Sequence, residues 1–226
     1  FAPGQYLTFK KHIGENELRR SYSICCSPND GELRVAIKKV EQGKFSGFAN
    51  ADLKPGDVLD VMPPLGKFSP RPSEKVRKHY LAFAAGSGIT PVMSIMRSVL
   101  ENEPQSEFTL VYGNKNRNTI IFREAIEGLK NRYMNRLRIY HILSREMMDV
   151  PLFNGRIDAA KVSELGQTLI DYKTVDEAFI CGPEDMLLSV RAQLQELGMP
   201  SEHIHIELFT SPDQPKASHE KRVKEH

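Results

Sequence analysis

The sequence predicts a protein of two domains, an antiparallel β-barrel followed by an α/β domain built on a doubly wound parallel sheet. The first third of the chain consists of short alternating segments between turn residues such as Pro55 and Gly56, which is typical of a small barrel. Beyond the charged, proline-rich stretch SPRPSEKVRKH, nearly all-apolar segments alternate with amphipathic ones, which indicates parallel strands joined by helices. We therefore expect the barrel over residues 1–72, the α/β domain over residues 73–210 and a linker-like tail over residues 211–226.

The barrel strands are expected at residues 5–10, 20–26, 32–40 and 56–64. The third of these places Leu33, Val35 and Ile37 on one face, with polar or small residues between them, as in a strand that buries one side. These strands predict a small antiparallel barrel or sandwich.

Two stretches of the barrel carry side chains suited to a flat anionic ligand. In RSYS, Arg20 can pair with a phosphate, Tyr22 can stack on an aromatic ring and Ser23 can hydrogen-bond a ring nitrogen. In GKFSGF, Gly43 can turn the chain and Ser46 can cap a short helix whose first turn could bind phosphate. Taken alone, an ordinary amphipathic strand and a plain helix cap explain them.

The α/β domain is expected to hold five strands and four helices. Helical spacing of apolar residues begins at Pro91 and Pro183, and a further helix is expected to end at Gly166. The remaining helix is expected over residues 122–131, and the strands over residues 80–85, 108–112, 137–143, 177–181 and 203–209.

The strongest single motif is AFAAGSGITPVM, in which a buried strand runs into Gly86-Ser87-Gly88 and a helix begins. Glycines permit a tight turn and let backbone N–H groups approach a phosphate at the positive end of a helix. Pro91 replaces the third glycine of G-x-G-x-x-G, so the standard dinucleotide pattern does not hold. A β–α turn without a ligand remains an alternative.

Three other strand ends of the same sheet carry polar or reactive groups. Cys181 in ICGPEDM would lie at the rim of a ligand crevice, or be buried as a small hydrophobe. Ser144 and Arg145 in HILSRE could hold a ribose 2′-phosphate, or form a solvated loop. Glu207 and Phe209 in IELF could supply a carboxylate and an aromatic lid, or simply end a strand.

Composition and cysteine count exclude several classes of protein. A net charge of +2 is too balanced to predict nucleic-acid binding, and no run approaches the ~20 apolar residues of a membrane span, so we expect a cytoplasmic protein. Three cysteines are too few for a plant-type [2Fe–2S] cluster, which needs four thiolates. Cys25 and Cys26 would point to opposite faces of a strand and are not expected to pair. The histidines, His203 and His205 included, show no metal spacing, and no metal site is expected.

The order of these motifs resembles that of the ferredoxin–NADP reductase superfamily. The series R-x-Y-S, G-x-x-S, G-x-G-x-T-P, S-R, C-G-P-x-x-M and E-x-F covers the chain from PGQY to Phe209. Within the superfamily, RSYSICCSP, KKVEQGKFSGF and YGNKNRNTIIFREAIEGL look most like reductase components of the phenylacetyl-CoA epoxygenase type, followed by flavohaemoglobin reductase domains.

The resemblance implies an FAD site in the barrel. Arg20 would bind the pyrophosphate, Tyr22 would pack on the isoalloxazine ring and Ser23 would face its N5. The family's barrel has strands earlier than FAPGQY, so the resemblance also implies a barrel that is open at this end. The remaining FAD-binding residues would be Ile37, Lys38, Gly43, Phe45 and Ser46.

The resemblance also implies an NADP(H) site in the second domain. Ser144 and Arg145 would bind the 2′-phosphate, Cys181 would lie near the nicotinamide C4, and Glu207 and Phe209 would close the other side of the flavin. Ser23, Cys181 and Glu207 would then be the catalytic residues. The nucleotide would further contact Gly86, Gly88, Thr90, Pro91, Gly113, Asn114, Gly182, Pro183 and Met186.

The function implied is transfer of electrons from NADPH through FAD to an iron–sulfur centre that serves an oxygenase or epoxygenase. The partners would be a [2Fe–2S] ferredoxin domain or protein, expected only outside this chain, and an oxygenase component. Two alternatives remain open: an NADH-dependent reductase of another oxygenase or flavohaemoglobin-like system, and a non-catalytic electron-relay module that binds nucleotide.

Overall fold

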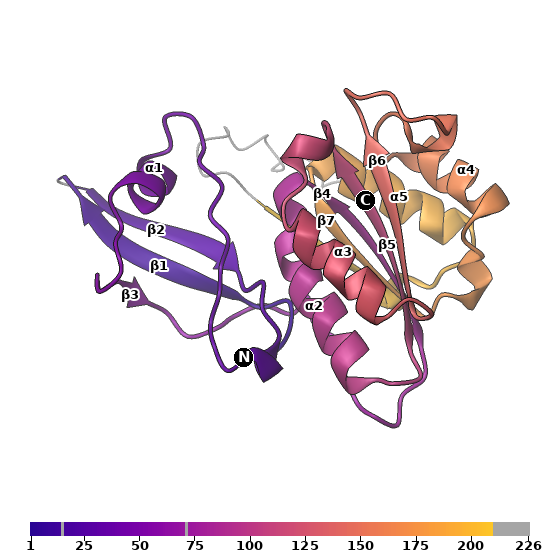
Figure 1. The fold of residues 1–226 in the computed structure, drawn as a ribbon, viewed down its shortest axis with the longest axis horizontal. Coiled ribbons are helices and arrows are strands. Elements are labelled where there is room, and N and C mark those ends of the chain that lie inside the picture. The colour runs from indigo at the N-terminus through magenta and orange to yellow at the C-terminus, as the bar shows by residue number, and fades with distance from the viewer. Residues whose placement is uncertain (15, 71, 210–226) are drawn as a thin grey trace, which may run out of the picture.

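The computed structural model describes residues 1–14, 16–70 and 72–209, which form two domains side by side (Figure 1). The first carries a three-stranded antiparallel sheet and one helix, and the second a five-stranded parallel sheet with helices on both faces. This confirms the predicted fold class. In the described part of the chain, no helix has the length and apolar character needed to cross a bilayer.

The first sheet has the strand order β2-β1-β3, and its central strand pairs with both neighbours. The register places Leu7 opposite Tyr22 and Phe9 opposite Arg20, so these four side chains share one face. The α1 helix packs on that face through Phe45, whose ring centroid lies 5.7 Å from that of Tyr22. The elements are β1 (Tyr6–Ile13), β2 (Asn16–Ser23), α1 (Lys44–Ala51) and β3 (Asp60–Val61), with a 3₁₀ turn η1 (Pro28–Asp30).

Two of the four predicted barrel strands are wrong or much shortened. Residues 32–40 form only an isolated bridge, Val35 to Ile24, and Leu33 on the supposedly buried face is 59% exposed. Residues 56–64 form only the two-residue strand β3. An alternating sequence makes a strand only where a neighbour supplies hydrogen bonds and an apolar surface, and within the described residues neither segment has such a neighbour along its length.

The second sheet is fully parallel and has the order β6-β5-β4-β7-β8. The chain enters at the central strand β4, builds outward to one side and then crosses over to build the other side, as in a doubly wound sheet. The strand order therefore reverses between β4 and β7. The strands are β4 (His79–Ala85), β5 (Glu107–Asn114), β6 (Leu137–Leu143), β7 (Glu177–Gly182) and β8 (Ile204–Leu208).

The two faces of this sheet bury separate apolar clusters. In β4, Ala82 and Ala84 face the cluster under α2 and α3, whereas Leu81 and Phe83 face the cluster under α4 and α5. This explains why β4 is apolar at almost every position. The helices are α2 (Ile89–Asn102), α3 (Arg123–Arg132), α4 (Ala159–Thr168) and α5 (Glu184–Glu196), with 3₁₀ turns η2 (Gly86–Gly88), η3 (Arg117–Thr119), η4 (Pro151–Phe153), η5 (Tyr172–Thr174) and η6 (Ser201–His203).

Two expected helix ends differ from the structure. The α2 helix begins two residues before Pro91, because the η2 turn leads directly into it. The α4 helix does not end at Gly166 but continues to Thr168. A Cβ on Gly166 would lie 2.8 Å from Cε2 of Tyr172, so this glycine makes room for a packed ring and does not stop the helix.

The α2 helix also joins the two domains. Arg97 donates to both carboxylate oxygens of Asp30 at 2.6 and 2.5 Å, and Ser94 donates to the Cys26 carbonyl at 2.6 Å. Ser27 donates to Glu101 at 2.5 Å. The α2 helix thus begins directly after the glycine turn η2, and one side of the helix contacts the first domain.

Candidate functional site

The reversal of strand order between β4 and β7 is where open α/β sheets bind ligands. Gly88, at the end of the η2 turn, lies against the end of β7 so closely that a Cβ would be 2.1 Å from the Cys181 carbonyl oxygen. On the other side, a Cβ on Gly182 would lie 2.7 Å from Met186. Glycine is therefore required at position 88, where the neighbouring atoms are backbone, whereas the methyl end of Met186 could move away from a Cβ at position 182.

The η2 turn presents its backbone to open space. Gly86 has φ +53 and no atom within 4 Å of the position of a Cβ. The Tyr112 hydroxyl donates to the Gly86 carbonyl at 3.0 Å, and the Thr90 hydroxyl donates to the Ser87 carbonyl at 3.0 Å. These two hydrogen bonds hold the turn in place. Thr90 and Pro91 are buried, so their contribution is to shape the turn and the start of α2.

The ends of β5 and β6 lie on the same edge of the sheet. Asn114 is buried, and within the described residues its side-chain N–H groups have no acceptor. Ser144 and Arg145, which follow β6, begin a loop that hydrogen-bonds to the end of β5. Gly113 packs against Ile157, whose Cδ1 would lie 3.0 Å from a Cβ.

Cys181 and Glu207 are neighbours on adjacent strands, as the register of β7 and β8 shows. Burial raises the pKa of the Cys181 thiol well above its ordinary value, and the nearby Glu207 carboxylate adds to this, so the thiol stays protonated. Burial also raises the pKa of Glu207. Cys181 is fully buried, Glu207 is half-buried, and Phe209, just past β8, is 38% exposed.

Arg20, Tyr22 and the start of α1 lie on one side of the first sheet. Tyr22 is half-buried, and its ring contacts those of Phe9 and Phe45 at 6.1 and 5.7 Å between centroids. Arg20 is two residues away on the same face, and its guanidinium donates to the Arg19 carbonyl at 2.8 Å. This face therefore combines a supported aromatic ring with a cation.

The other predicted flavin residues take different positions. Ser23 is buried and points to the face opposite Tyr22. Gly43, not Ser46, is the N-cap of α1, and a Cβ there would lie 2.5 Å from the Ser46 hydroxyl. That hydroxyl accepts from Val40 N–H at 3.1 Å and donates to the Gly43 carbonyl, so it closes the turn before α1. The roles in flavin binding of these residues, and of Ile37 and Lys38, remain predictions.

Sequence reasoning missed Phe9 and Asn50. Phe9 contacts Tyr22 and Phe45, and the register of an antiparallel pair was the signal that could have found it. Asn50 donates to the carbonyls of Ile37 and Ser46 at 3.2 and 2.8 Å, and so links α1 to the segment before it. Its only signal was an amide four residues after Ser46, on the same side of a helix.

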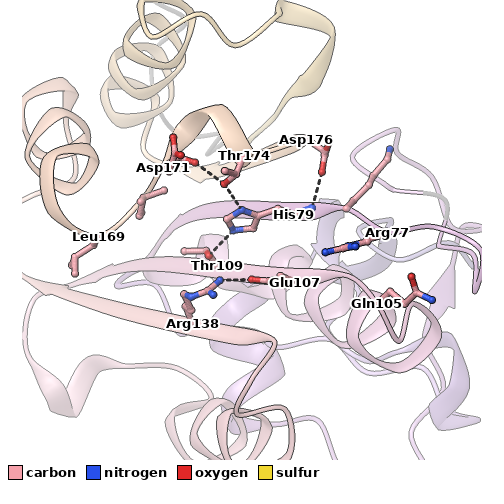
Figure 2. Close-up of a pocket in the computed structure, with 12 residues that line it drawn as sticks. Arg77, His79, Gln105, Glu107, Thr109, Arg138, Leu169, Asp171, Thr174 and Asp176 are labelled. Carbon is pink, nitrogen blue, oxygen red and sulfur yellow. Dashed lines mark hydrogen bonds and ion pairs between the residues drawn. The ribbon is translucent and has the colours of Figure 1, made fainter.

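A cavity of about 530 Å³ lies at the opposite, amino-terminal edge of the parallel sheet (Figure 2). Among its lining residues, Arg138 donates to Glu107 at 2.5 Å, and His79 is held between the hydroxyls of Thr109 and Thr174 at 2.9 and 3.1 Å. Burial lowers the pKa of His79. Because nucleotides bind at the carboxyl edge of such sheets, this cavity is not the predicted cofactor site.

Beside this cavity, Glu177 forms a polar centre whose contribution to stability depends on pH. Burial alone would raise its pKa, but hydrogen bonds from His205 and Lys78, at 2.7 and 2.8 Å, lower it to about 2. A carboxyl with a lowered folded-state pKa stabilises the protein above its unfolded pKa, and this stability is lost as pH falls toward 2. We expect Glu177→Gln to cost ~1–2 kcal/mol at pH 7, after allowance for solvent screening, and much less near pH 3.

Urea unfolding of the wild type and of Glu177→Gln, each at pH 7 and at pH 3, measures the difference in their free energies of unfolding. The matched control is Glu127→Gln, which removes an exposed carboxylate paired with Arg123. A Glu177→Gln difference that stays constant with pH would contradict the assignment.

In comparison with known proteins, each of the two domains of the structure matches a different protein family. The oxidoreductase FAD-binding domain family matches residues 1–69, and the oxidoreductase NAD-binding domain family matches residues 83–192. One component of the 1,2-phenylacetyl-CoA epoxidase of Escherichia coli K12 is 46% identical over 94% of this chain and 60% of its own length. The ferredoxin reductase component of the 3-ketosteroid-9-alpha-monooxygenase of Rhodococcus rhodochrous is 32% identical over 93% of this chain and 56% of its own length. The chain thus spans less than two thirds of either relative.

Solved structures share the fold. The FAD/NAD-binding domain of the nitric oxide dioxygenase of Vibrio cholerae superposes with a TM-score of 0.78 at 22% identity, and the match covers 92% of this chain and 85% of that one. The cytochrome b5 reductase domain of Ulva prolifera nitrate reductase has a TM-score of 0.75 at 25% identity, with the same coverage. This chain therefore belongs to the oxidoreductases in which an FAD-binding domain is followed by an NAD-binding domain, and its sequence is similar to that of a ferredoxin reductase component.

Proposed function

We propose that this chain is the flavin and nucleotide module of an NADPH-dependent reductase, which passes electrons from NADPH through FAD to an iron–sulfur centre serving an oxygenase. The observation that carries this proposal is the η2 turn, where Gly86 exposes backbone to open space and Gly88 packs against the Cys181 carbonyl. A turn of this kind at the reversal of strand order suits a nucleotide diphosphate, because N–H groups and the helix dipole both favour negative charge.

The residues on the α1 side of the first sheet fit FAD. Arg20 would bind the diphosphate, and the Tyr22 ring, supported from beneath by the buried Phe45, would orient the flat ring system. The first turn of α1 has no side-chain cap, and its N-cap Gly43 lets the chain turn tightly there. Bound flavin supplies the conversion of a two-electron hydride donor into single electrons.

Residues of the second domain would bind and shield the nucleotide. The η2 backbone would bind the diphosphate, and Arg145 would bind a 2′-phosphate. Cys181, which is buried and protonated, would exclude water at the end of β7 without a charge. Glu207, whose pKa burial raises, would place its carboxyl beside that thiol at the edge of the nucleotide site.

The proposed partners are a [2Fe–2S] ferredoxin domain or protein and an oxygenase component of the phenylacetyl-CoA type. The support is the 46% identity to a component of a phenylacetyl-CoA epoxidase. We further propose a cytoplasmic location, because the three cysteines are free and buried, as is usual where thiols are kept reduced.

The test measures FAD binding and reduction by NADPH. We expect FAD to bind, its visible absorption to be bleached by NADPH, and Arg20→Leu to weaken FAD binding ~10-fold or more, because a charge-assisted hydrogen bond is lost. The matched control is Arg19→Leu, which changes the neighbouring arginine on the opposite face of β2, where it pairs with Glu17.

Three outcomes would contradict the proposal. Faster bleaching by NADH than by NADPH favours the NADH-dependent alternative. Binding of FAD without bleaching by either nucleotide favours a non-catalytic relay module. Equal losses in Arg19→Leu and Arg20→Leu would remove Arg20 from the site.

A further inference from the structure

The loop after β6 is fixed at several points before any ligand binds. Its first two amides donate to the end of β5, from Ser144 to the Asn114 carbonyl at 3.0 Å and from Arg145 to the Lys115 carbonyl at 2.8 Å. Further along, the Met148 amide donates to the Asn154 side chain at 2.7 Å. The backbone that carries Arg145 is therefore ordered by contacts on both sides of it.

Glu146 is the side chain that joins this loop to the η3 turn after β5. One carboxylate oxygen accepts from the backbone N–H of Arg117 at 2.8 Å, and the other lies 3.1 Å from Nε of the same arginine. The Arg117 guanidinium also donates to Met148 Sδ at 3.7 Å. The η3 turn is itself closed by mutual hydrogen bonds between Asn116 and Thr119. Glu146 thus binds to a turn that is already closed by its own hydrogen bonds.

The two arginines of this edge differ in what they bind. Arg117 is neutralised by Glu146, whereas the guanidinium of Arg145 has no hydrogen-bond or ion-pair partner within the described residues. Without the Arg117 guanidinium, the Glu146 carboxylate would keep its backbone hydrogen bond but would carry an uncompensated charge one residue from Arg145. It would then repel a phosphate or pair with Arg145 itself, because opposite charges a few ångströms apart attract even near a protein surface.

We propose that Glu146 and Arg117 form a positioning pair that fixes Arg145 for a nucleotide 2′-phosphate and cancels the carboxylate that would otherwise compete for it. This inference rests on the proposed function, in which Arg145 binds that phosphate. Glu146 supplies the anchor of the loop, and Arg117 removes the charge that this anchor introduces. A preordered loop loses little further entropy when the phosphate binds, which favours nucleotides that carry one.

The experiment measures the affinities of 2′-phospho-AMP and of AMP by titration calorimetry. In Arg117→Gln, we expect the preference for 2′-phospho-AMP to fall about fivefold to tenfold while AMP affinity stays unchanged, because only the phosphate senses the freed carboxylate. In Arg117→Gln/Glu146→Gln both charges are removed, but an amide oxygen at position 146 can still accept from the backbone N–H at position 117 and so keep the loop anchored; the preference should return to within about threefold of the wild-type value. The matched control is Arg123→Gln, which breaks an exposed arginine–glutamate pair on α3.

Any other outcome contradicts the proposal. The variant Arg145→Gln shows whether the proposed function fails as well or only the positioning pair. If the wild type shows no preference, or Arg145→Gln keeps it, the 2′-phosphate assignment and this inference both fail. If Arg145→Gln loses the preference but Arg117→Gln keeps it, or the double variant does not recover it, only the positioning pair is wrong. Equal losses of AMP and 2′-phospho-AMP binding would make the pair merely structural and would also overturn the proposal.

Discussion

Replacing Gly88 with alanine is expected to destabilise the protein by about 3 kcal/mol and to abolish nucleotide binding. The new Cβ would lie 2.1 Å from the Cys181 carbonyl oxygen, 2.6 Å from its carbon and 3.0 Å from the Gly182 nitrogen. All three atoms are backbone atoms of β7 or its end, in the middle of a fully paired sheet, so none can move aside cheaply. The η2 turn must shift instead, and the backbone that faces the open space shifts with it.

Urea unfolding and nucleotide titration measure the two effects. The matched control is Gly128→Ala in α3, where nothing lies within 4 Å of the new Cβ, and the change should stabilise the helix by up to ~1 kcal/mol. An unfolding midpoint of Gly88→Ala equal to that of the wild type would show that the close contact between η2 and β7 does not exist in solution.

Arg97→Met is expected to have the second largest effect, because it breaks the ion pair between the domains. Arg97 binds both oxygens of Asp30, and the two side chains are only 22% and 17% exposed. Loss of one partner leaves the Asp30 carboxylate poorly solvated, and we expect a cost of ~2–3 kcal/mol. Because the proposed nucleotide-binding turn η2 leads directly into α2, reduction of the flavin by NADPH should slow in parallel.

A control variant separates the effect of losing the ion pair between the domains from the effect of losing a positive charge. Arg123→Met removes the same charge from an exposed pair on α3 and should cost less than ~0.5 kcal/mol. Urea unfolding gives the stability change, and stopped-flow absorbance gives the rate of flavin reduction. Unaltered stability together with an unaltered reduction rate in Arg97→Met would mean that the domains are positioned by other contacts, such as the packing of Phe68 on Phe179.

The second domain could be predicted from sequence because its signals are local. An apolar run such as residues 80–85 can be a strand only if both of its faces are covered, which implies helices on both sides. The glycines of η2 then mark where β4 ends. By contrast, the strand expected at residues 32–40 depended on neighbours that no local pattern can guarantee, and Leu33 is exposed where a buried side chain was expected.

The sequence could indicate candidate site residues by their chemical type, but it could not show which of these residues contact one another. Sequence indicated Tyr22 as a stacking residue, but not the Phe45 and Phe9 rings packed against it, which come together only through strand register and the return of α1. Nor could the sequence show that Cys181 and Glu207 are neighbours, because their pairing follows from the order of strands in the sheet. Contacts between distant segments depend on the order and register of the strands, which no single segment of the sequence determines.

The position of α2 between the two domains has a consequence for how the molecule unfolds. Most of its residues are buried, since one side covers β4 and β5 while the other receives Asp30, Ser27 and the Cys26 carbonyl. A helix shared in this way cannot melt without exposing apolar surface of the second domain and breaking the hydrogen bonds that it makes to the first. The two domains, each of which has its own sheet, are therefore coupled into a single cooperative unit, and local opening of one is limited by the stability of the other.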